Sequence, residues 1–351
     1  MVKVVIVGGG FAGCAAAISA RKAGAEVTLI EKLDEVLGTG LAGGVMRNNG
    51  RFTATEEAIA MGGGGLIFQL IDSVSPHKNV VGFPGHNHPS FYYRMYAEPV
   101  VKKAILDLGI EVLLESRMEE VEKQGDAIVS VGLEDGTRVA GDVFMDATGT
   151  SGPMGLCKKY GNGCVSCILR CPTFGGRVSL AGKAGVKEFM GHRQDGTPGA
   201  MTGAFDIHKE SLAPHIAREL TEKGVIVVPL PHPHDEQLRL KTCQQYALRE
   251  FAENLVIVDN GYGKVHTSFV PLEVLRSIPG FERAHICAPL AGSKGNSIRY
   301  LAMAPRDNTL KVKGLANLFC GGEKAGVFVG HTEAIVTGSL AGRNAVLFGL
   351  G

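Results

Sequence analysis

The sequence predicts an α/β protein whose larger domain carries a parallel sheet and into which a smaller α+β domain is inserted. Three observations predict this fold. Residues 4–7 form a short apolar run that leads directly into Gly8, Gly10 and Gly13, the spacing Gly-x-Gly-x-x-Gly. Apolar runs then alternate with helical patterns, the order that builds a parallel sheet. Glycine accounts for 49 of the 351 residues, about 14% against an average of about 7%, as expected of a backbone that often turns or closely approaches a ligand.

Composition and charge exclude several classes of protein. With 45% apolar and 20% charged residues, the chain can bury a core, so wholesale disorder and collagen are both excluded. The formal net charge of +1 weakens the case for nucleic-acid binding without excluding RNA as a partner. No run of about 18 apolar residues predicts a membrane span, and no secretory signal is recognisable. We therefore expect a cytoplasmic protein with no membrane contact and with reduced cysteines.

Each position of the glycine pattern suits the pyrophosphate of a dinucleotide in a Rossmann-like fold. Gly8 permits the tight turn after the strand, Gly10 lets the pyrophosphate approach the backbone, and Gly13 allows close packing of helix on strand. Phe11 and Ala12 lie at the helix start, where free N–H groups attract phosphate. A glycine-rich turn without a ligand is the alternative, but strand, glycines, helix, second strand and a terminal acid all occur in order.

The second strand ends in an acidic residue. Residues 14–22 have the pattern of a helix and residues 26–30 that of a strand, which is followed by Glu31 and Lys32. A carboxylate about 20 residues beyond the glycines accepts hydrogen bonds from ribose hydroxyls. We therefore expect Glu31 to bind the nucleotide ribose, with Lys32 beside it.

Two later strands end near residues that suit a cofactor. One is predicted at residues 110–114 and includes Val112, and it is followed by a charged hairpin. The other is predicted at residues 143–145 and leads through Asp146 into Ala147-Thr148-Gly149.

The C-terminal segment repeats the sequence of strand, glycine turn and helix. Residues 317–326 contain a short strand followed by Gly322 and Glu323. Gly330 and His331 then lead into an apolar helix predicted at Thr332–Leu347. The start of this helix is a second place where backbone N–H groups could meet a ligand.

Together, these segments resemble the FAD domain of the glutathione-reductase-like flavoproteins. The resemblance implies that the Ala-Thr-Gly strand end passes beside FAD, that Gly322 and Glu323 lie along its ribityl-pyrophosphate, and that the last helix points its start at the flavin pyrimidine. A helix N-terminus there stabilises negative charge on reduced flavin, and His331 is the best single candidate for a hydrogen bond to the pyrimidine. The absence of a second glycine pattern favours FAD over a separate NAD(P)H domain. The cofactor-binding candidates are Gly8, Gly10, Phe11, Ala12, Gly13, Glu31, Lys32, Val112, Ala147, Thr148, Gly149, Gly322, Glu323, Gly330, His331 and Thr332.

A closer resemblance covers residues 1–60 and 270–350. Residues 275–284 and 307–344 look like the folate- and FAD-dependent tRNA uracil-5-methyltransferase family, and the N-terminal motif is also similar to the tRNA wobble-uridine modifying flavoproteins. The resemblance implies FAD and adds methylenetetrahydrofolate as a further candidate cofactor. That family carries a nucleophilic cysteine after the second strand, whereas residues 43–49 contain none. The resemblance therefore assigns no methyl-transfer residues, and the catalytic residues stay unknown.

Four cysteines are clustered in the middle of the chain. Cys157, Cys164, Cys167 and Cys171, followed by Pro172, have the spacing C-x6-C-x2-C-x3-C-P. The bacterial ferredoxin run is C-x2-C-x2-C-x3-C-P, so the last three cysteines and the proline match a [4Fe–4S] site. The alternatives are structural zinc, a redox-active pair formed by Cys164 and Cys167, and unligated thiols.

The predicted domains follow from these motifs. The FAD-binding domain is expected to be discontinuous, comprising residues 1–155 and 300–351, and the inserted domain to span residues 156–300 and begin with the cysteine cluster. Strands are predicted at residues 224–228 and 254–258, and helices at 98–108, 209–223 and 235–253.

The sequence supports three hypotheses about function. The first is an FAD-dependent oxidoreductase that couples FAD to a [4Fe–4S] cluster and exchanges electrons with a small molecule or a protein partner. The second is a folate- and FAD-dependent RNA uracil-5-methyltransferase, favoured by the C-terminal resemblance and opposed by the missing cysteine. The third is a protein that holds flavin without turnover.

Overall fold

The computed structural model of the chain describes most but not all of its residues. These are residues 1–48, 51–62, 64–149, 173–192, 196, 200–202, 205–233, 246–267, 270–288, 297–299, 302–326 and 330–351. The four clustered cysteines at positions 157, 164, 167 and 171 lie outside the described residues, as do residues 234–245.

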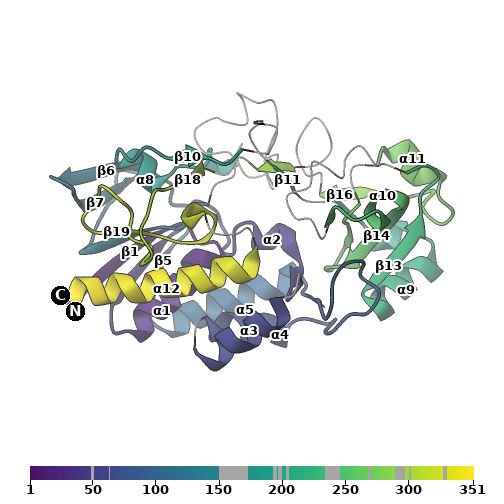
Figure 1. The fold of residues 1–351 in the computed structure, drawn as a ribbon, viewed down its shortest axis with the longest axis horizontal. Helices are drawn as coiled ribbons and strands as arrows, with labels where there is room; N and C mark the ends of the chain where they lie inside the picture. The colour runs from purple at the N-terminus through teal and green to yellow at the C-terminus, as the bar shows by residue number, and fades with distance from the viewer. Residues whose placement is uncertain are drawn as a thin grey trace.

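A parallel sheet of five strands organises the N-terminal part of the chain. Its strand order is β19-β9-β1-β2-β5, and every neighbouring pair is parallel. Four strands come from the first 146 residues, and β19 joins them from near the C-terminus (Figure 1). The strands are β1 (Lys3–Val7), β2 (Glu26–Ile30), β5 (Glu111–Leu113), β9 (Val143–Asp146) and β19 (Leu318–Cys320). The predicted α/β class and its parallel sheet are confirmed.

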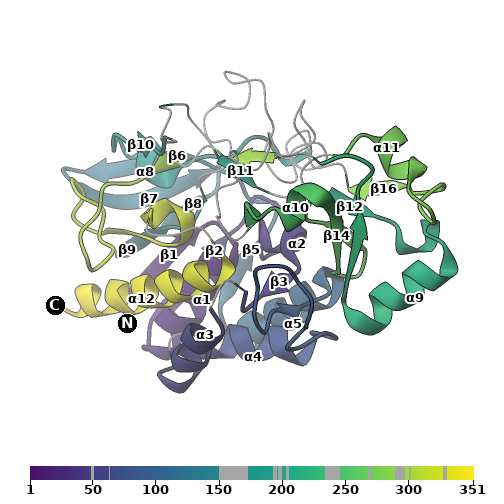
Figure 2. The same cartoon turned by 45° about the vertical axis from the view of Figure 1, so that its right-hand side comes forward.

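The parallel sheet is covered on both faces. One face carries a three-stranded antiparallel sheet, whose buried Met118, Ile128 and Val131 join the core of the parallel strands. The other face carries helices, among them α1 (Phe11–Lys22) and α12 (His331–Leu350) (Figures 1 and 2). Both chain ends lie at the same end of the molecule in these views.

Helices α1 and α12 run parallel and pack with their backbones in contact. A Cβ at Gly338 would overlap the carbonyl oxygen of Ala12, and a Cβ at Gly342 would overlap that of Ala16. Ser19 Oγ adds a hydrogen bond of 2.7 Å to the carbonyl oxygen of Ser339. Since only glycine permits this approach, the C-terminal helix is locked onto the helix that follows the first glycine turn.

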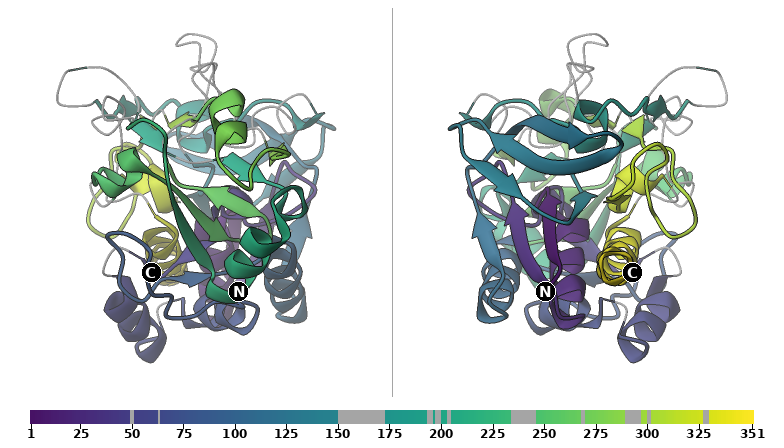
Figure 3. Two further views of the ribbon diagram at one scale, coloured as in Figure 1. Left: turned by 90° about the vertical axis from the view of Figure 1, so that its right-hand side faces the viewer. Right: turned by 90° about the vertical axis from the view of Figure 1, so that its left-hand side faces the viewer.

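The second large sheet is antiparallel. Its strand order is β13-β14-β15-β12-β16, with all strands from residues 205–288 (Figure 3). Its strands are β12 (Phe205–Ile207), β13 (Val225–Pro229), β14 (Asn254–Asp259), β15 (Gly263–Val265) and β16 (Ile286–Ala288). Residues of this sheet contribute to two hydrophobic clusters. One consists almost entirely of residues 205–286, and the other also contains Phe83 and Phe91 from the N-terminal part. The proposed boundaries at residues 155 and 300 stay a prediction.

The remaining described elements are short or peripheral. The other helices are α2 (Gly40–Gly43), α3 (Arg51–Ala60), α4 (Gly65–Ser73), α5 (Arg94–Asp107), α8 (Leu180–Lys183), α9 (Pro214–Lys223), α10 (Glu250–Glu253), α11 (Leu272–Ser277), and the 3-10 helices η2 (Lys209–Ser211) and η5 (Gly322–Ala325). The other strands are β3 (Val45–Met46), β4 (Ser90–Phe91), β6 (Met118–Gln124), β7 (Ala127–Leu133), β8 (Arg138–Ala140), β10 (Phe189–Met190), β11 (Ala200–Thr202), β17 (Ser297–Arg299) and β18 (Ala302–Met303). None of the helices in the described ranges has the length and apolar character needed to cross a membrane.

Three helix predictions need correction. The helix expected at residues 209–223 is divided into η2 and α9, because Pro214 starts a helix well but disfavours helical backbone in the residue before it. Helix α5 begins at Arg94 rather than at residue 98, and it carries Pro99 in its interior instead of in its first turn. The helix expected at residues 235–253 is wrong over residues 246–249, which do not form an α-helix.

Candidate functional site

The carboxyl edge of the parallel sheet brings together the predicted cofactor residues from segments far apart in the sequence. The glycine turn follows β1, Glu31 follows β2, Ala147-Thr148-Gly149 follows β9, and Gly322 follows β19. Ligands of open parallel sheets bind at this edge. The arrangement is therefore that of a candidate dinucleotide site.

The glycine turn is tight at its two ends and open in its middle. Gly8 has a φ of +103°, and a Cβ there would overlap the carbonyl oxygen of Ala147. A Cβ at Gly13 would overlap the carbonyl oxygen of Gly8. At Gly10 the nearest atom to a Cβ would be Leu37 O, 4.0 Å away. Gly8 and Gly13 are thus required by the fold itself, whereas Gly10 borders free space.

Helix α1 begins beside that free space without a side-chain cap. Gly10 is its N-cap residue and offers no side chain to the first amides, and Phe11 and Ala12 form the first turn. The first N–H groups of a helix have no partner within the helix and carry partial positive charge. An anion at Gly10 would meet these donors.

Glu31 is buried, with 6% of its surface exposed, and ties the glycine turn to the end of β2. Its Oε2 accepts a hydrogen bond of 2.6 Å from the backbone N–H of Gly9, and its Oε1 accepts one of 2.9 Å from the N–H of Leu33. Each carboxylate oxygen can accept more than one hydrogen bond. The carboxylate is therefore held in a fixed position from which it can also accept from a ribose.

Lys32, next to Glu31 in the sequence, and Val112, on the neighbouring strand β5, make different contacts. Lys32 Nζ donates a hydrogen bond of 3.1 Å to the carbonyl oxygen of Gly175, just after the cysteine segment in sequence. Val112 lies in β5, paired with Leu29 of β2, and its side chain is half-buried. The edge of β2 thus contacts residues that return from the cysteine segment.

Asp146 ends β9 and is a structural centre of the site, although it was not among the predicted cofactor residues. It is fully buried, and its Oδ1 accepts hydrogen bonds from the N–H and the hydroxyl of Thr148 at 3.0 and 2.6 Å. Its Oδ2 accepts one of 2.8 Å from the N–H of Ala181. An acid at the carboxyl end of a buried strand was the available signal. Asp146 shapes the turn that carries Thr148 and Gly149.

The turn after β19 is fixed to both helices. Gly322 has a φ of +66°, and a Cβ there would lie 2.9 Å from the Cβ of Ala12. Its N–H donates a hydrogen bond of 2.9 Å to Thr337 Oγ1 of α12. Glu323 follows in η5. The predicted residues of this turn therefore lie against the start of α1.

A buried cation follows Glu323. Lys324 is fully buried, and its Nζ contacts Glu188 Oε1 at 2.6 Å and Ser179 Oγ at 3.1 Å. A buried charge needs such a partner. This ion pair attaches residues 179–188, which follow the cysteine segment, to the turn after β19.

Helix α12 starts beyond the start of α1. Because Gly338 packs on Ala12, the first six residues of α12 overhang α1 by about 9 Å at 1.5 Å per residue. His331 Nδ1 lies 3.2 Å from the carbonyl oxygen of Val45 and 3.5 Å from the Tyr92 hydroxyl, and its ring centroid is 5.0 Å from that of Phe11. Thr332 is buried against Met46. Gly330 is the N-cap of this helix.

Residues 43–49, which contain no cysteine, include one charged residue, Arg47. Arg47 is buried, has a φ of +60°, and forms ion pairs with Glu56 and Asp72. Burial lowers its pKa, but the hydrogen bonds that Arg47 donates to Asp72 and Glu56 outweigh this effect, so the pKa is raised. Arg47 is a structural link between β3 and the helices α3 and α4.

Two of the described cysteines, Cys14 and Cys320, are unsuited to redox chemistry. Cys14 and Cys320 are buried, and burial raises the pKa of each thiol to about 12. Within the described ranges, no group of three or more His, Cys, Asp or Glu residues is placed to hold a metal ion. The predicted cluster ligands Cys157, Cys164, Cys167 and Cys171 lie outside those ranges.

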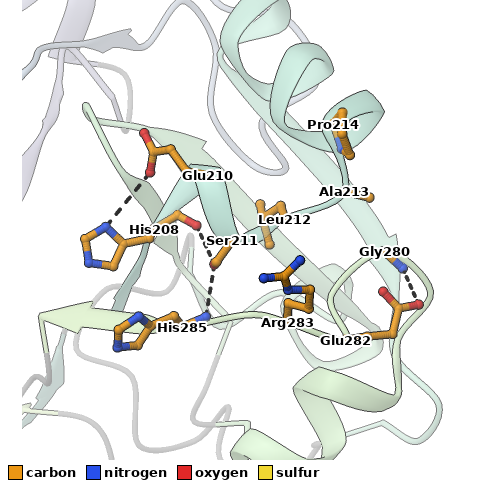
Figure 4. A pocket seen from close by; sticks show the side chains of 10 residues that line it. All are labelled: His208, Glu210, Ser211, Leu212, Ala213, Pro214, Gly280, Glu282, Arg283 and His285. Carbon is orange, nitrogen blue, oxygen red and sulfur yellow. Dashed lines mark hydrogen bonds and ion pairs between the residues drawn. The ribbon is translucent and has the colours of Figure 1, made fainter.

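A separate cavity of about 840 Å³ lies beside the antiparallel sheet. Figure 4 shows His208, Arg283 and His285 on its walls, together with Glu210 and Ser211 of η2 and Pro214 at the start of α9. The two imidazole centroids are 5.2 Å apart. None of the predicted cofactor residues lines it, so this cavity is distinct from the edge of the parallel sheet.

Comparisons with known proteins agree with this geometry. Residues 3–153 match the family described as FAD dependent oxidoreductase, and residues 250–351 match the family described as Glucose inhibited division protein A. The fold is similar to two crystal forms of GidA from Aquifex aeolicus, with TM-scores of 0.71 and 0.65 at 16% and 15% identity. All of this chain is aligned, but it spans only 64% and 66% of those two chains.

A more distant structural neighbour has the same fold. A geranylgeranyl bacteriochlorophyll reductase-like protein from Thermoplasma acidophilum aligns with a TM-score of 0.58 at 13% identity, over 99% of this chain and 78% of that one. At these identities, the likeness establishes the fold of the parallel sheet and its attached elements.

Proposed function

We propose that the chain is an FAD-dependent oxidoreductase that binds FAD across the carboxyl edge of the parallel sheet. The observation that carries the proposal is the glycine turn, which is closed at Gly8 and Gly13 and open at Gly10, beside the uncapped start of α1. A pyrophosphate fits such a cradle because backbone N–H groups face it and no Cβ excludes it. The match of residues 3–153 to the FAD dependent oxidoreductases supports the same cofactor.

The other residues at the edge fit the remaining parts of FAD. Glu31 would hold the adenosine ribose, and Thr148 and Gly149 would lie beside the dinucleotide. Gly322 would border the ribityl-pyrophosphate, and the start of α12 would face the flavin pyrimidine. Bound FAD accepts two electrons as hydride and releases electrons singly, which suits exchange between a hydride donor and a one-electron carrier.

The cradle is tested by Gly10→Ala. Gly10 has a φ of −67° and open space around a Cβ, so alanine should leave the stability of the apoprotein unchanged. The methyl group would occupy the place of the pyrophosphate, and we expect FAD affinity to fall at least about tenfold, equivalent to about 1.4 kcal/mol. Titration of wild-type and variant apoprotein with FAD, followed by flavin fluorescence, measures this difference. Equal affinities would contradict the proposed site.

We propose further that Cys157, Cys164, Cys167 and Cys171 bind a [4Fe–4S] cluster that exchanges electrons with FAD. Their spacing supports this assignment. So do the two ends of their segment, because Gly149 lies against Arg177 and Gly175 accepts a hydrogen bond from Lys32. The cluster would thus lie near the edge at which FAD binds.

Metal analysis of anaerobically purified protein tests the cluster. We expect about four irons per chain and broad absorption near 400 nm in addition to the flavin bands. Cys164→Ala should lose both, whereas Cys320→Ala, which removes a buried cysteine with a raised pKa, should keep the iron. Iron-free wild-type protein, or zinc in place of iron, would contradict the cluster and leave the FAD site standing.

Methyl transfer to RNA is the second candidate function. The match of residues 250–351 to Glucose inhibited division protein A, together with the resemblance to the tRNA-modifying flavoproteins, favours it. The absence of a cysteine at residues 43–49 opposes it. Incubation with methylenetetrahydrofolate and unmodified RNA separates this function from electron transfer. A bound flavin that no donor reduces would instead support the third hypothesis, a protein that holds flavin without turnover.

A further inference from the structure

One buried carboxylate oxygen at the start of α12 lacks a hydrogen-bond partner. Glu333 is the third residue of α12, and its Oε1 forms an ion pair with Nε of Arg51, the first residue of α3. Its Oε2 is inaccessible to solvent and has no hydrogen-bond partner among the described residues. Only 19% of the Glu333 side chain and 18% of the Arg51 side chain are exposed. A buried acceptor of this kind is costly and is rare in native proteins unless a ligand or water completes it.

Helix capping does not account for this oxygen. A glutamate at the third helical position commonly accepts a hydrogen bond from the N–H of the N-cap residue. Here Glu333 Oε2 lies against Gly330, the N-cap, so closely that a Cβ on Gly330 would overlap it. Even so, Gly330 N–H does not donate to it. The oxygen thus lies at the very start of α12, in the overhang beyond α1, as a buried acceptor without a donor among the described residues.

The start of α12 therefore combines two kinds of group. The first N–H groups of the helix are donors, and the orphaned Glu333 oxygen beside them is an acceptor. The pyrimidine edge of the isoalloxazine ring carries the complementary pair of groups. Its C2=O can accept from the helix N–H groups, and its adjacent N3–H can donate to the Glu333 oxygen. The hydrogen-bonding groups of this pyrimidine edge are thus complementary to those at the start of α12.

We infer that Glu333 Oε2 is the acceptor for the N3–H of the flavin, and that Arg51 neutralises the carboxylate from its other side. This inference rests on the proposed function, because it requires FAD at the edge of the parallel sheet. It gives Glu333 a positioning role: the hydrogen bond fixes the in-plane orientation of the ring, while the ion pair keeps a full negative charge from opposing flavin reduction. A flavin without the N3–H donor would leave the oxygen unsatisfied.

N3-methyl-FAD provides the direct test, because a methyl group replaces the N3 hydrogen and removes this donor. Wild-type apoprotein should bind FAD at least about tenfold more tightly than N3-methyl-FAD, the size expected of a hydrogen bond to a charged group. Glu333→Leu removes the acceptor, so FAD affinity should fall and the discrimination should shrink below about threefold. Glu333→Gln keeps a neutral acceptor and should restore part of the discrimination.

Arg51→Met is the matched control. It removes the ion pair but keeps the Glu333 acceptor, so it should still discriminate against N3-methyl-FAD. If Glu333 served only as the structural partner of Arg51, Glu333→Leu and Arg51→Met would lose discrimination equally, and the inference would be overturned. A wild type that binds both flavins alike overturns it as well while leaving the FAD site intact. A wild type that binds no FAD overturns the proposed function together with this inference.

Discussion

At the scale of single residues, Glu31 shows how the candidate site is built into the fold before any ligand arrives. Its carboxylate accepts hydrogen bonds from the backbone of Gly9 in the glycine turn and of Leu33 after β2. The same side chain that would bind ribose thus also holds the cradle in shape. Position and chemistry of the residue were predictable from the sequence, whereas its structural hydrogen bonds were not.

Glu31→Gln should destabilise the apoprotein. The amide nitrogen would face one of the two backbone N–H donors, so one charge-assisted hydrogen bond is lost and a buried donor is left unsatisfied. We expect the free energy of unfolding to fall by about 1–3 kcal/mol, measured by urea denaturation. The matched control is Glu26→Gln, at an exposed ion pair with Lys3, which should change it by less than about 0.5 kcal/mol. Equal losses in the two variants would mean that Glu31 has no structural role.

His86 should make the stability depend on pH. Burial, assisted by the charge of Arg51, lowers its pKa to about 4 from an ordinary value of about 6.5. Between these values the unfolded chain binds a proton that the folded chain does not, so stability is present above pH 6.5 and falls as the pH is lowered towards 4. The slope should reach about 1.4 kcal/mol per pH unit.

The His86→Phe variant isolates this contribution. Phenylalanine keeps the stacking on Phe83, whose ring centroid is 4.4 Å from the imidazole, and removes the titration. Unfolding free energies of the two proteins are measured from pH 7 to pH 4.5, and the wild type should lose stability relative to the variant as the pH falls. A constant difference between the two curves would show that His86 titrates normally in the folded protein.

At the scale of elements, the contact of α1 with α12 transmits changes to the candidate site. Gly338 and Gly342 bring the α12 backbone onto Ala12 and Ala16, so α12 cannot move without moving the start of α1. Gly338→Ala should destabilise the protein by about 1–3 kcal/mol and weaken FAD binding, because a methyl group would overlap a carbonyl oxygen. Thermal unfolding and FAD titration measure both effects.

A second variant on the same helix controls for the general effect of introducing alanine into α12. Leu340 is 44% exposed, so Leu340→Ala should leave the melting temperature and the FAD affinity close to those of the wild type. If Gly338→Ala proved as mild as Leu340→Ala, the close packing of the two helices would not be needed for the site.

Elements with clear local signals were predictable, and those fixed by distant contacts were not. The strand at residues 26–30 was predicted with its observed bounds, because β-branched residues lie between a glycine turn and an acid. The early start of α5 depends on tertiary contacts: Tyr92 donates to the carbonyl oxygen of Gly40, and Arg94 pairs with Asp206. No local pattern announces these partners, which are 52 and 112 residues away.

At the scale of the whole molecule, the candidate site is assembled from both ends of the chain. Residues 8–31 supply the cradle and the acid proposed to bind ribose, and residues 322–326 and 330–333 supply the turn and the helix start beside it. In the sequence, the spacing of Gly8, Gly10 and Gly13 identified the N-terminal half of the site, and Gly322 and Glu323 identified the C-terminal half. Asp146 and Glu333 were not among the predicted site residues, because their roles come from what the folded chain places around each carboxylate.

The central claim is that this edge of the parallel sheet binds one FAD. It is tested most directly by quantifying the flavin released on denaturation of wild-type protein that has been incubated with FAD and freed of excess. We predict about one FAD per chain, with no FMN and no NAD(H) retained. A protein that retains no FAD after this treatment would contradict the claim, whatever its cysteines bind.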